Sequence, residues 1–124
     1  MAIIGIGIDL VDIERFRTSL TRTPSMRTRL FTDIELEYVA PQADPIPSLA
    51  ARFAAREAVM KSLGLGLGAF GFHEVWVERA DSGEPSLAII GRARLLADDA
   101  GVRNWHLSLT HSATTAGAYV VAER

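Results

Sequence analysis

The chain has 124 residues, of which 48% are hydrophobic and 23% charged, as is ordinary for a globular protein. This length predicts a single domain over residues 1–124. It has no cysteine, which excludes a disulfide framework, a thiolate metal site and a cysteine nucleophile. No apolar run reaches the roughly 18–20 residues of a membrane span, and the formal net charge is only −2, so we expect neither a membrane nor a nucleic acid as partner.

The chain opens with an isoleucine-rich apolar run over residues 2–11, which we interpret as a buried strand. Asp12 can cap a helix that runs to about Leu20, before the break at 23–25. The first residues lack the basic segment and the small-residue cleavage site of a secretory signal, so we expect a cytoplasmic protein.

Two more helices are predicted in the first half of the chain. Thr32 and Glu35 have the spacing of a capping box and predict a short helix. A loop with three prolines follows at 40–47. Ser48 is then expected to cap the most strongly helical segment, residues 49–63.

The second half of the chain alternates short strands with one helix. In order we expect a glycine-rich loop at 64–71, a strand at 73–79, a turn at 81–83, a strand at 86–90, a helix at 93–100, and two strands at 105–110 and 116–122. The short polar link between the last two strands predicts a hairpin. Together the elements predict an α+β fold in which a long helix packs on a mainly antiparallel sheet.

Positive charge is concentrated early in the chain. Five arginines and no acid lie between residues 15 and 29, namely Arg15, Arg17, Arg22, Arg27 and Arg29. On a nearly neutral protein, such a block indicates either an acidic partner or a solvated helix face, and charge alone does not choose between them.

Asp9 lies at the end of a glycine-lined face of the first strand. Because side chains alternate along a strand, Gly5, Gly7 and Asp9 share one face. Glycines there permit the close approach of a ligand or of another backbone. Asp9 is therefore either a metal ligand or acid–base group beside open space, or the acid that starts the following helix.

The helix at 49–63 places charges on its apolar side. Its apolar stripe consists of Leu49, Phe53, Met60 and Leu63. Arg56 falls within this stripe and Glu57 at its border. One interpretation is structural: Glu57 pairs with Lys61 four residues later, and Arg56 extends its charge outward to solvent. The other is that Glu57 meets a second acid and forms a site for a hard divalent cation.

Three further features could contribute to a site. Lys61 is the only lysine against twelve arginines, which hints at a need for a compact ammonium group. The glycines at 64–68 could offer backbone N–H groups to an anion. His111 ends a strand, where it is either a phosphate-binding or proton-transferring group or a hydrogen-bonded structural histidine.

Four separated motifs, in this order, resemble the bacterial holo-[acyl-carrier-protein] synthases over nearly the whole chain. The motifs are Gly5-Ile6-Gly7-Ile8-Asp9-Leu10-Val11, Phe31-Thr32 with Glu35, Arg52-Phe53-Ala54-Ala55-Arg56-Glu57-Ala58 with Lys61 and Leu63-Gly64, and Ser108-Leu109-Thr110-His111.

The resemblance implies a single-domain 4'-phosphopantetheinyl transferase that forms a homotrimer with active sites between protomers. It implies that Asp9 and Glu57 bind Mg²⁺ and act with Lys61 in catalysis. The residues that match coenzyme A contacts are Arg52, Lys61, Gly64, Thr110 and His111. The residues that match the docking surface for an acidic acyl carrier protein are Arg15, Arg22 and Arg27.

The implied reaction transfers phosphopantetheine from coenzyme A to a carrier serine and releases adenosine 3',5'-bisphosphate. Glu57 or a metal-bound water is the preferred acceptor of the serine proton, and His111 is a weaker candidate. Two alternatives remain: a non-catalytic carrier-binding module of the same fold, and an unrelated metal-dependent nucleotide phosphotransferase.

The chain departs from the family pattern at three positions. Arg56 stands where the family usually has lysine, so a direct contact by this residue is in question. Leu65 removes a hydroxyl from the loop after the long helix. Ser112 follows the histidine where an acid is more common.

Overall fold

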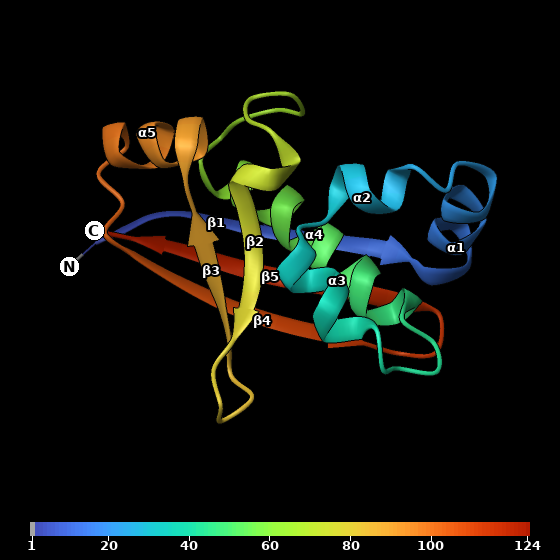
Figure 1. Cartoon of the computed structure of the whole chain (residues 1–124). Helices are drawn as coiled ribbons and strands as arrows, with labels where there is room; N and C mark the ends of the chain where they lie inside the picture. Colours follow the sequence, from blue (N-terminus) through green and yellow to red (C-terminus); the bar gives the residue numbers. More distant parts are fainter. Residues whose placement is uncertain (1) are drawn as a thin grey trace.

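The computed structural model describes residues 2–124 and has the predicted α+β fold (Figure 1). Within these residues no helix is both long and apolar enough to cross a membrane. The elements are β1 (Ile3–Asp12), α1 (Ile13–Arg22), α2 (Met26–Leu30), α3 (Asp33–Val39), α4 (Ile46–Ser62), η1 (Phe72–Glu74), β2 (Val75–Arg79), β3 (Pro85–Ile89), α5 (Gly91–Asp99), β4 (Asn104–His111) and β5 (Thr115–Glu123).

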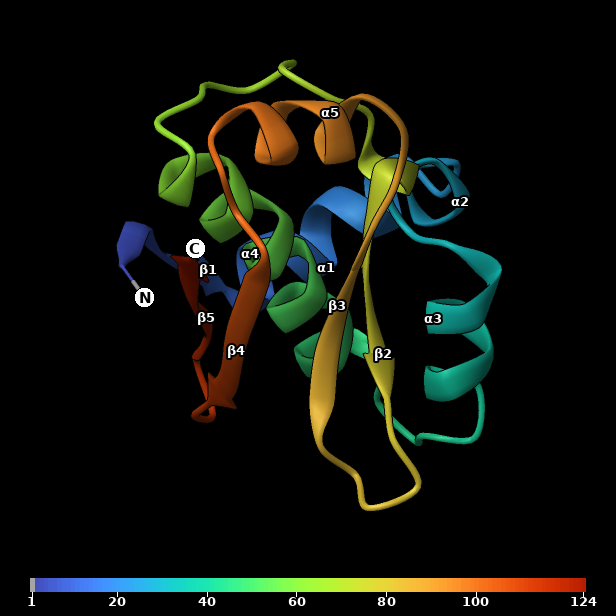
Figure 2. The same cartoon turned by 90° about the vertical axis from the view of Figure 1, so that its left-hand side faces the viewer.

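The strands form two antiparallel sheets rather than one. The larger has the order β1-β5-β4, with the predicted hairpin β4–β5 and the first strand added at the free edge of β5. The smaller consists of β2 and β3. Helix α4 lies between the three-stranded sheet on one side and β2 with α3 on the other (Figure 2). It is therefore the central element of the fold, and most of its side chains are buried.

Strand β1 approaches α4 more closely than any side chain would allow. A Cβ atom on Gly5 would overlap the carbonyl oxygen of Ser62, and one on Gly7 would overlap that of Ala58. The sequence left open whether these glycines admit a ligand or a backbone, and the structure shows that they admit the backbone of α4. Glycine is required at both positions because a helix lies against the strand.

The opposite face of β1 is open in the single chain. Ile6, Ile8 and Leu10 point away from α4, and Leu10 is 66% exposed. Tyr119 of β5 continues this apolar face beside Ile8. The prediction of a buried strand is therefore wrong for the isolated chain, because the hydrophobic pattern has two apolar faces and only one of them is covered.

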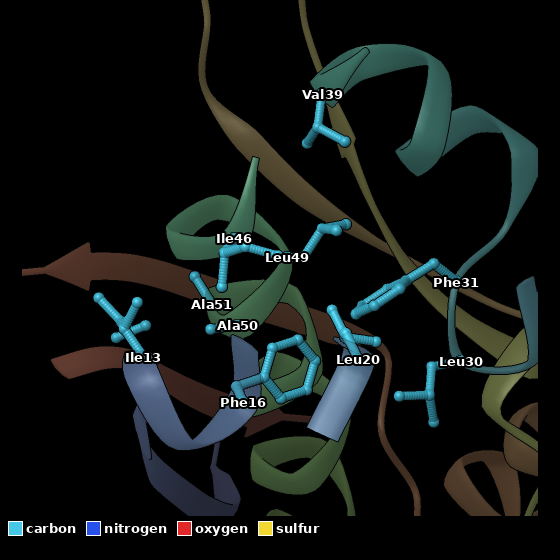
Figure 3. Packing of buried hydrophobic residues seen from close by; sticks show 11 residues of the cluster. Ile13, Phe16, Leu20, Leu30, Phe31, Val39, Ile46, Leu49, Ala50 and Ala51 are labelled. Carbon is cyan, nitrogen blue, oxygen red and sulfur yellow. The ribbon is translucent and has the colours of Figure 1, made fainter. Parts of the chain in front are cut away.

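Helix α1 folds back over α4 through a compact apolar cluster. Ile13, Phe16 and Leu20 of α1 pack with Ala50 and Ala51 of α4 (Figure 3). The ring centroids of Phe16 and Phe53, which packs against this cluster from α4, lie 5.5 Å apart. This packing sets α1 beside the end of β1, where Asp9 is found.

Side-chain caps explain where two of the α-helices begin. The side chain of Asp12 accepts a hydrogen bond from Arg15 N at the start of α1, as predicted. Thr32 and Glu35 form the predicted capping box of α3. The prediction that Ser48 caps α4 is wrong, because α4 begins at Ile46 and includes Pro47 in its first turn, where a proline needs no hydrogen-bond partner. Helix α2 was not predicted.

We expect a methyl group at position 7 to separate β1 from α4. Gly7→Ala should lower the free energy of unfolding by about 2 kcal/mol or more, because the new Cβ meets backbone atoms that cannot move aside. Gly66→Ala is the matched control: Gly66 has no positive φ, and a Cβ added there would have no atom within 4 Å. Urea denaturation measures both, and equal midpoints for the two variants would contradict the role given to Gly7.

Candidate active site

Asp9 and Lys61 meet across the contact between β1 and α4. The Lys61 ammonium group donates to Asp9 Oδ1 at 3.0 Å and to the carbonyl oxygen of Ile8 at 2.9 Å. The Asp9 side chain is 17% exposed, and that of Lys61 is 52% exposed. Lys61 thus reaches from the last turn of α4 to the strand, and the predicted pairing with Glu57 on its own helix is replaced by this contact.

Glu57 completes an acidic pair with Asp9. Burial raises the pKa of Glu57 above its ordinary value, the nearby charge of Asp9 raises it further, and Lys61 offsets part of the rise. An added cation would stabilise the charged form of Glu57 beside Asp9 in this partly buried place.

Both carboxylates open into one pocket of about 420 Å³ at the junction of β1, α1 and α4. The pocket is lined by Asp9, Leu10, Val11, Asp12, Arg15, Phe16, Ser19, Met26, Phe53 and Glu57. The apolar members were missed as site residues, although the i, i+3 spacing of Phe16 and Ser19 places them on one helix face with Ile13. The pocket therefore combines acids, one arginine and an apolar wall.

The donor set of this pocket fits a hard divalent cation with incomplete protein coordination. Mg²⁺ prefers oxygen ligands and usually keeps several waters, binding through one or two carboxylates and a substrate phosphate. Asp9 and Glu57 supply that number of carboxylates. No group of three or more metal-binding side chains occurs among residues 2–124, so a fully protein-built cage is absent from the described chain.

Arg52 and Arg56 lie away from this pocket, on the side of α4 that faces α3 and β2. The guanidinium of Arg52 donates to the carbonyl oxygen of Ser48 and lies 4.6 Å from the ring centroid of Tyr38. Burial lowers the pKa of Arg52. Its Nε is the one buried side-chain nitrogen or oxygen within residues 2–124 that lacks a hydrogen-bond partner.

Arg56 is fully buried and its guanidinium is occupied by protein partners. It forms a two-pronged ion pair with Glu35, at 2.5 and 2.9 Å, and donates to the carbonyl oxygens of Phe72 and Arg52. The predicted outward extension to solvent is therefore wrong, because Glu35 offers a buried partner from α3. The arginine at this position has a structural contact and no free donor directed at the pocket.

The remaining predicted coenzyme A contacts are dispersed in the single chain. Gly64 follows α4 with a φ of +70°, one turn beyond Lys61. Thr110 lies on the open sheet face beside Leu10. His111 is exposed at the end of β4, and because β5 separates β4 from β1, it lies two strand spacings, roughly 10 Å, from Val11.

In the arginine block, Arg17 forms ion pairs with acids of this chain, whereas Arg15, Arg22 and Arg27 are exposed. Arg17 binds both carboxylate oxygens of Asp44, at 2.8 and 3.0 Å, and also pairs with Glu14. Arg15 and Arg22 of α1 and Arg27 of α2 are exposed. The predicted docking residues are thus solvent-accessible, and Arg15 lines the pocket itself.

Comparison with known proteins gives the family. The profile of the 4'-phosphopantetheinyl transferase superfamily matches residues 5–122. The holo-[acyl-carrier-protein] synthase of Streptomyces avermitilis is 51% identical over 124 residues, covering 99% of each chain. The chain belongs to the holo-[acyl-carrier-protein] synthase family.

Solved structures agree with this assignment. The holo-[acyl-carrier-protein] synthase of Neisseria meningitidis has a TM-score of 0.89 at 30% identity, covering 99% of this chain and 100% of its own. The Bacillus anthracis enzyme, solved in complex with CoA (3',5'-ADP), has a TM-score of 0.80 at 30% identity, covering 97% and 96% of the two chains. The fold of this synthase family member is therefore that of its relatives.

We expect the Glu35–Arg56 pair to be a major support of the fold. Arg56→Met would leave the Glu35 carboxylate buried without its partner, at a cost of roughly 3–5 kcal/mol of unfolding free energy. The double variant Glu35→Gln/Arg56→Met removes both charges and should recover part of that loss. Urea denaturation of the single and double variants measures the effect, and wild-type stability in Arg56→Met would contradict it.

Proposed function

We propose that this chain transfers the 4'-phosphopantetheine group of coenzyme A to a serine of an apo-acyl carrier protein. The products are holo-acyl carrier protein and adenosine 3',5'-bisphosphate. The observation that carries the proposal is the cluster of Asp9, Glu57 and Lys61 at a pocket that Arg15 also lines, in a chain of the synthase family. The Bacillus anthracis relative binds CoA (3',5'-ADP).

Asp9 and Glu57 are the residues that would hold Mg²⁺. When bound, the ion supplies positive charge next to the pyrophosphate of coenzyme A, where negative charge develops during transfer. Lys61 adds an ammonium group beside the same two acids, in reach of a phosphate oxygen that approaches the pocket mouth.

The reaction exchanges one phosphorus–oxygen bond for another. The serine oxygen of the carrier attacks the phosphorus that bears pantetheine, and the bond from that phosphorus to the oxygen of the leaving bisphosphate breaks. The serine proton must go to a base. We assign it to Glu57, whose carboxylate lines the pocket beside Asp9, or to a water held at the same place. His111 lies on the far strand of the sheet and is less suited within one chain.

The free arginines on α1 and α2 form the proposed docking surface for the carrier. Arg15, Arg22 and Arg27 are exposed, while Arg17 holds the loop before α4 through Asp44. An acidic carrier would be attracted to this surface and brought with its serine to the pocket that Arg15 lines.

We also propose that the working form is a homotrimer with sites between protomers, in the cytoplasm and in service of fatty-acid synthesis. Two features support the assembly. The apolar face of Ile6, Ile8, Leu10 and Tyr119 is uncovered in the single chain. His111 and Thr110 lie away from the carboxylates, so a second chain would have to bring such groups to the site.

The non-catalytic alternative is not favoured. A module that only bound carriers would need the arginine surface but not two converging acids with a lysine, and all three are present together. The family departure at Arg56 is also accounted for by its buried pairing with Glu35.

Intact-mass spectrometry tests the reaction directly. An apo-acyl carrier protein incubated with this chain, coenzyme A and Mg²⁺ should gain the mass of one phosphopantetheine group. The gain should require the metal and disappear in the Asp9→Ala/Glu57→Ala variant, provided that circular dichroism shows it folded. No gain with several carriers that bind the folded wild-type chain would support the non-catalytic module instead.

The proposed assembly is tested by placing a charge in the open face. Ile8→Glu should give a folded monomer in light scattering coupled to gel filtration, with transfer reduced at least about tenfold, because burying an unpaired carboxylate is costly. Leu95→Glu is the matched control, since Leu95 is a comparably exposed apolar residue on α5. A wild-type chain that is monomeric and fully active would refute the trimer.

A further inference from the structure

Lys61 places its ammonium group on the carboxylate that we assign to the metal. Its Nζ lies 3.0 Å from Asp9 Oδ1 and 2.9 Å from the carbonyl oxygen of Ile8. Lys61 is the single lysine in the sequence.

An ammonium group and a divalent cation compete for the same oxygen. The two positive charges repel strongly at the few ångströms that would separate them on one carboxylate. A cation that binds Asp9 through Oδ1 must therefore displace Lys61 or accept a weaker site. The same holds in reverse, because Lys61 loses its carboxylate partner when the cation enters.

The side chain of Lys61 is free to leave. It is 52% exposed and follows the last buried turns of α4, so its movement uncovers little of the core. The contact between β1 and α4 is already held by the close approach at Gly5 and Gly7. A half-exposed ion pair adds little to such packing, so the stability of the fold does not explain why the pair is there.

We infer that Lys61 is a switch that weakens cation binding in the substrate-free chain and is released when coenzyme A draws its ammonium group to a phosphate. The inference rests on the proposed function. Coenzyme A then raises the affinity for the cation by freeing Asp9, and by reciprocity the cation raises the affinity for coenzyme A by the same factor. The chain would therefore bind its metal efficiently only together with its phosphate-bearing substrate.

The switch differs from a plain phosphate contact in its effect on the free protein. If Lys61 lay away from Asp9 in solution and only contacted phosphate, its removal would weaken coenzyme A binding and leave cation binding unchanged. If Lys61 blocks Asp9, its removal strengthens cation binding when no substrate is present. The second effect is measured without any turnover.

Mn²⁺ is the probe, followed by the loss of the free-ion signal in electron paramagnetic resonance. Without coenzyme A, Lys61→Met should bind Mn²⁺ at least about fivefold more tightly than the wild type, the lower end of ordinary coupling between sites. Arg94→Met removes one positive charge from a distant ion pair with Asp98 on α5 and should match the wild type. Lys61→Gln provides a second neutral side chain if the methionine variant folds poorly in circular dichroism.

A second set of titrations includes coenzyme A, with protein-free samples to subtract Mn²⁺ bound to coenzyme A alone. Coenzyme A should increase the Mn²⁺ affinity of the wild type by a larger factor than that of Lys61→Met, because the variant has no ammonium group left to release. An equal increase in the two proteins would overturn the switch.

Two outcomes separate this inference from the proposed function. Equal or weaker Mn²⁺ binding by Lys61→Met and Lys61→Gln, in a wild type that modifies carriers, overturns the switch and leaves the function intact. Wild-type Mn²⁺ binding by Asp9→Asn would show that the cation lies elsewhere, and would overturn both the switch and the assigned metal residues. The carrier modification itself is judged separately by intact mass.

Discussion

The close approach of β1 to α4 is the constraint on which the rest of the molecule depends. Gly5 and Gly7 bring the strand against the carbonyl oxygens of the helix, at a distance that excludes any side chain. Two residues further along the same strand face, Asp9 is carried to the last turns of α4 and meets Lys61. The position of the acid therefore follows from two residues that have no side chain, because they fix how far apart the two backbones lie.

On the side that faces α3, α4 is held by a buried ion pair instead of a close backbone contact. Arg56 is held by Glu35 from α3 and by the carbonyl oxygen of Phe72, all away from solvent. Neighbouring helix positions differ by about 100°, so anchoring Arg56 towards α3 turns Glu57 towards β1 and the pocket. A buried residue that lies away from the pocket thus helps to set the direction of one that lines it.

Sequence patterns predicted structure formed by residues close together in the chain. They did not predict contacts between residues far apart in the chain. The cap at Asp12 and the final hairpin involve residues close together in the chain, and both were found from the sequence. Ser48 was misplaced as a cap because prolines are tolerated in a first helical turn. The partners of Arg56 and Lys61 lie 21 and 52 residues away, so periodicity could place these charges on a helix face but could not say what they meet. The roles given to the site residues came from the family resemblance and stay predictions.

The two faces of strand β1 have different roles: one packs closely on α4, and the other is apolar and exposed. The glycine face fits the helix and carries Asp9, while Ile6, Ile8 and Leu10 face outward with nothing covering them in the single chain. Exposing these apolar side chains to water is unfavourable in free energy, so we expect another molecule to cover this face of the strand. In the proposed trimer, one strand would then both position the acid and form the contact between chains. Assembly and the geometry of the site would be linked through the same ten residues, because a shift of β1 against a neighbour would also move Asp9 against α4.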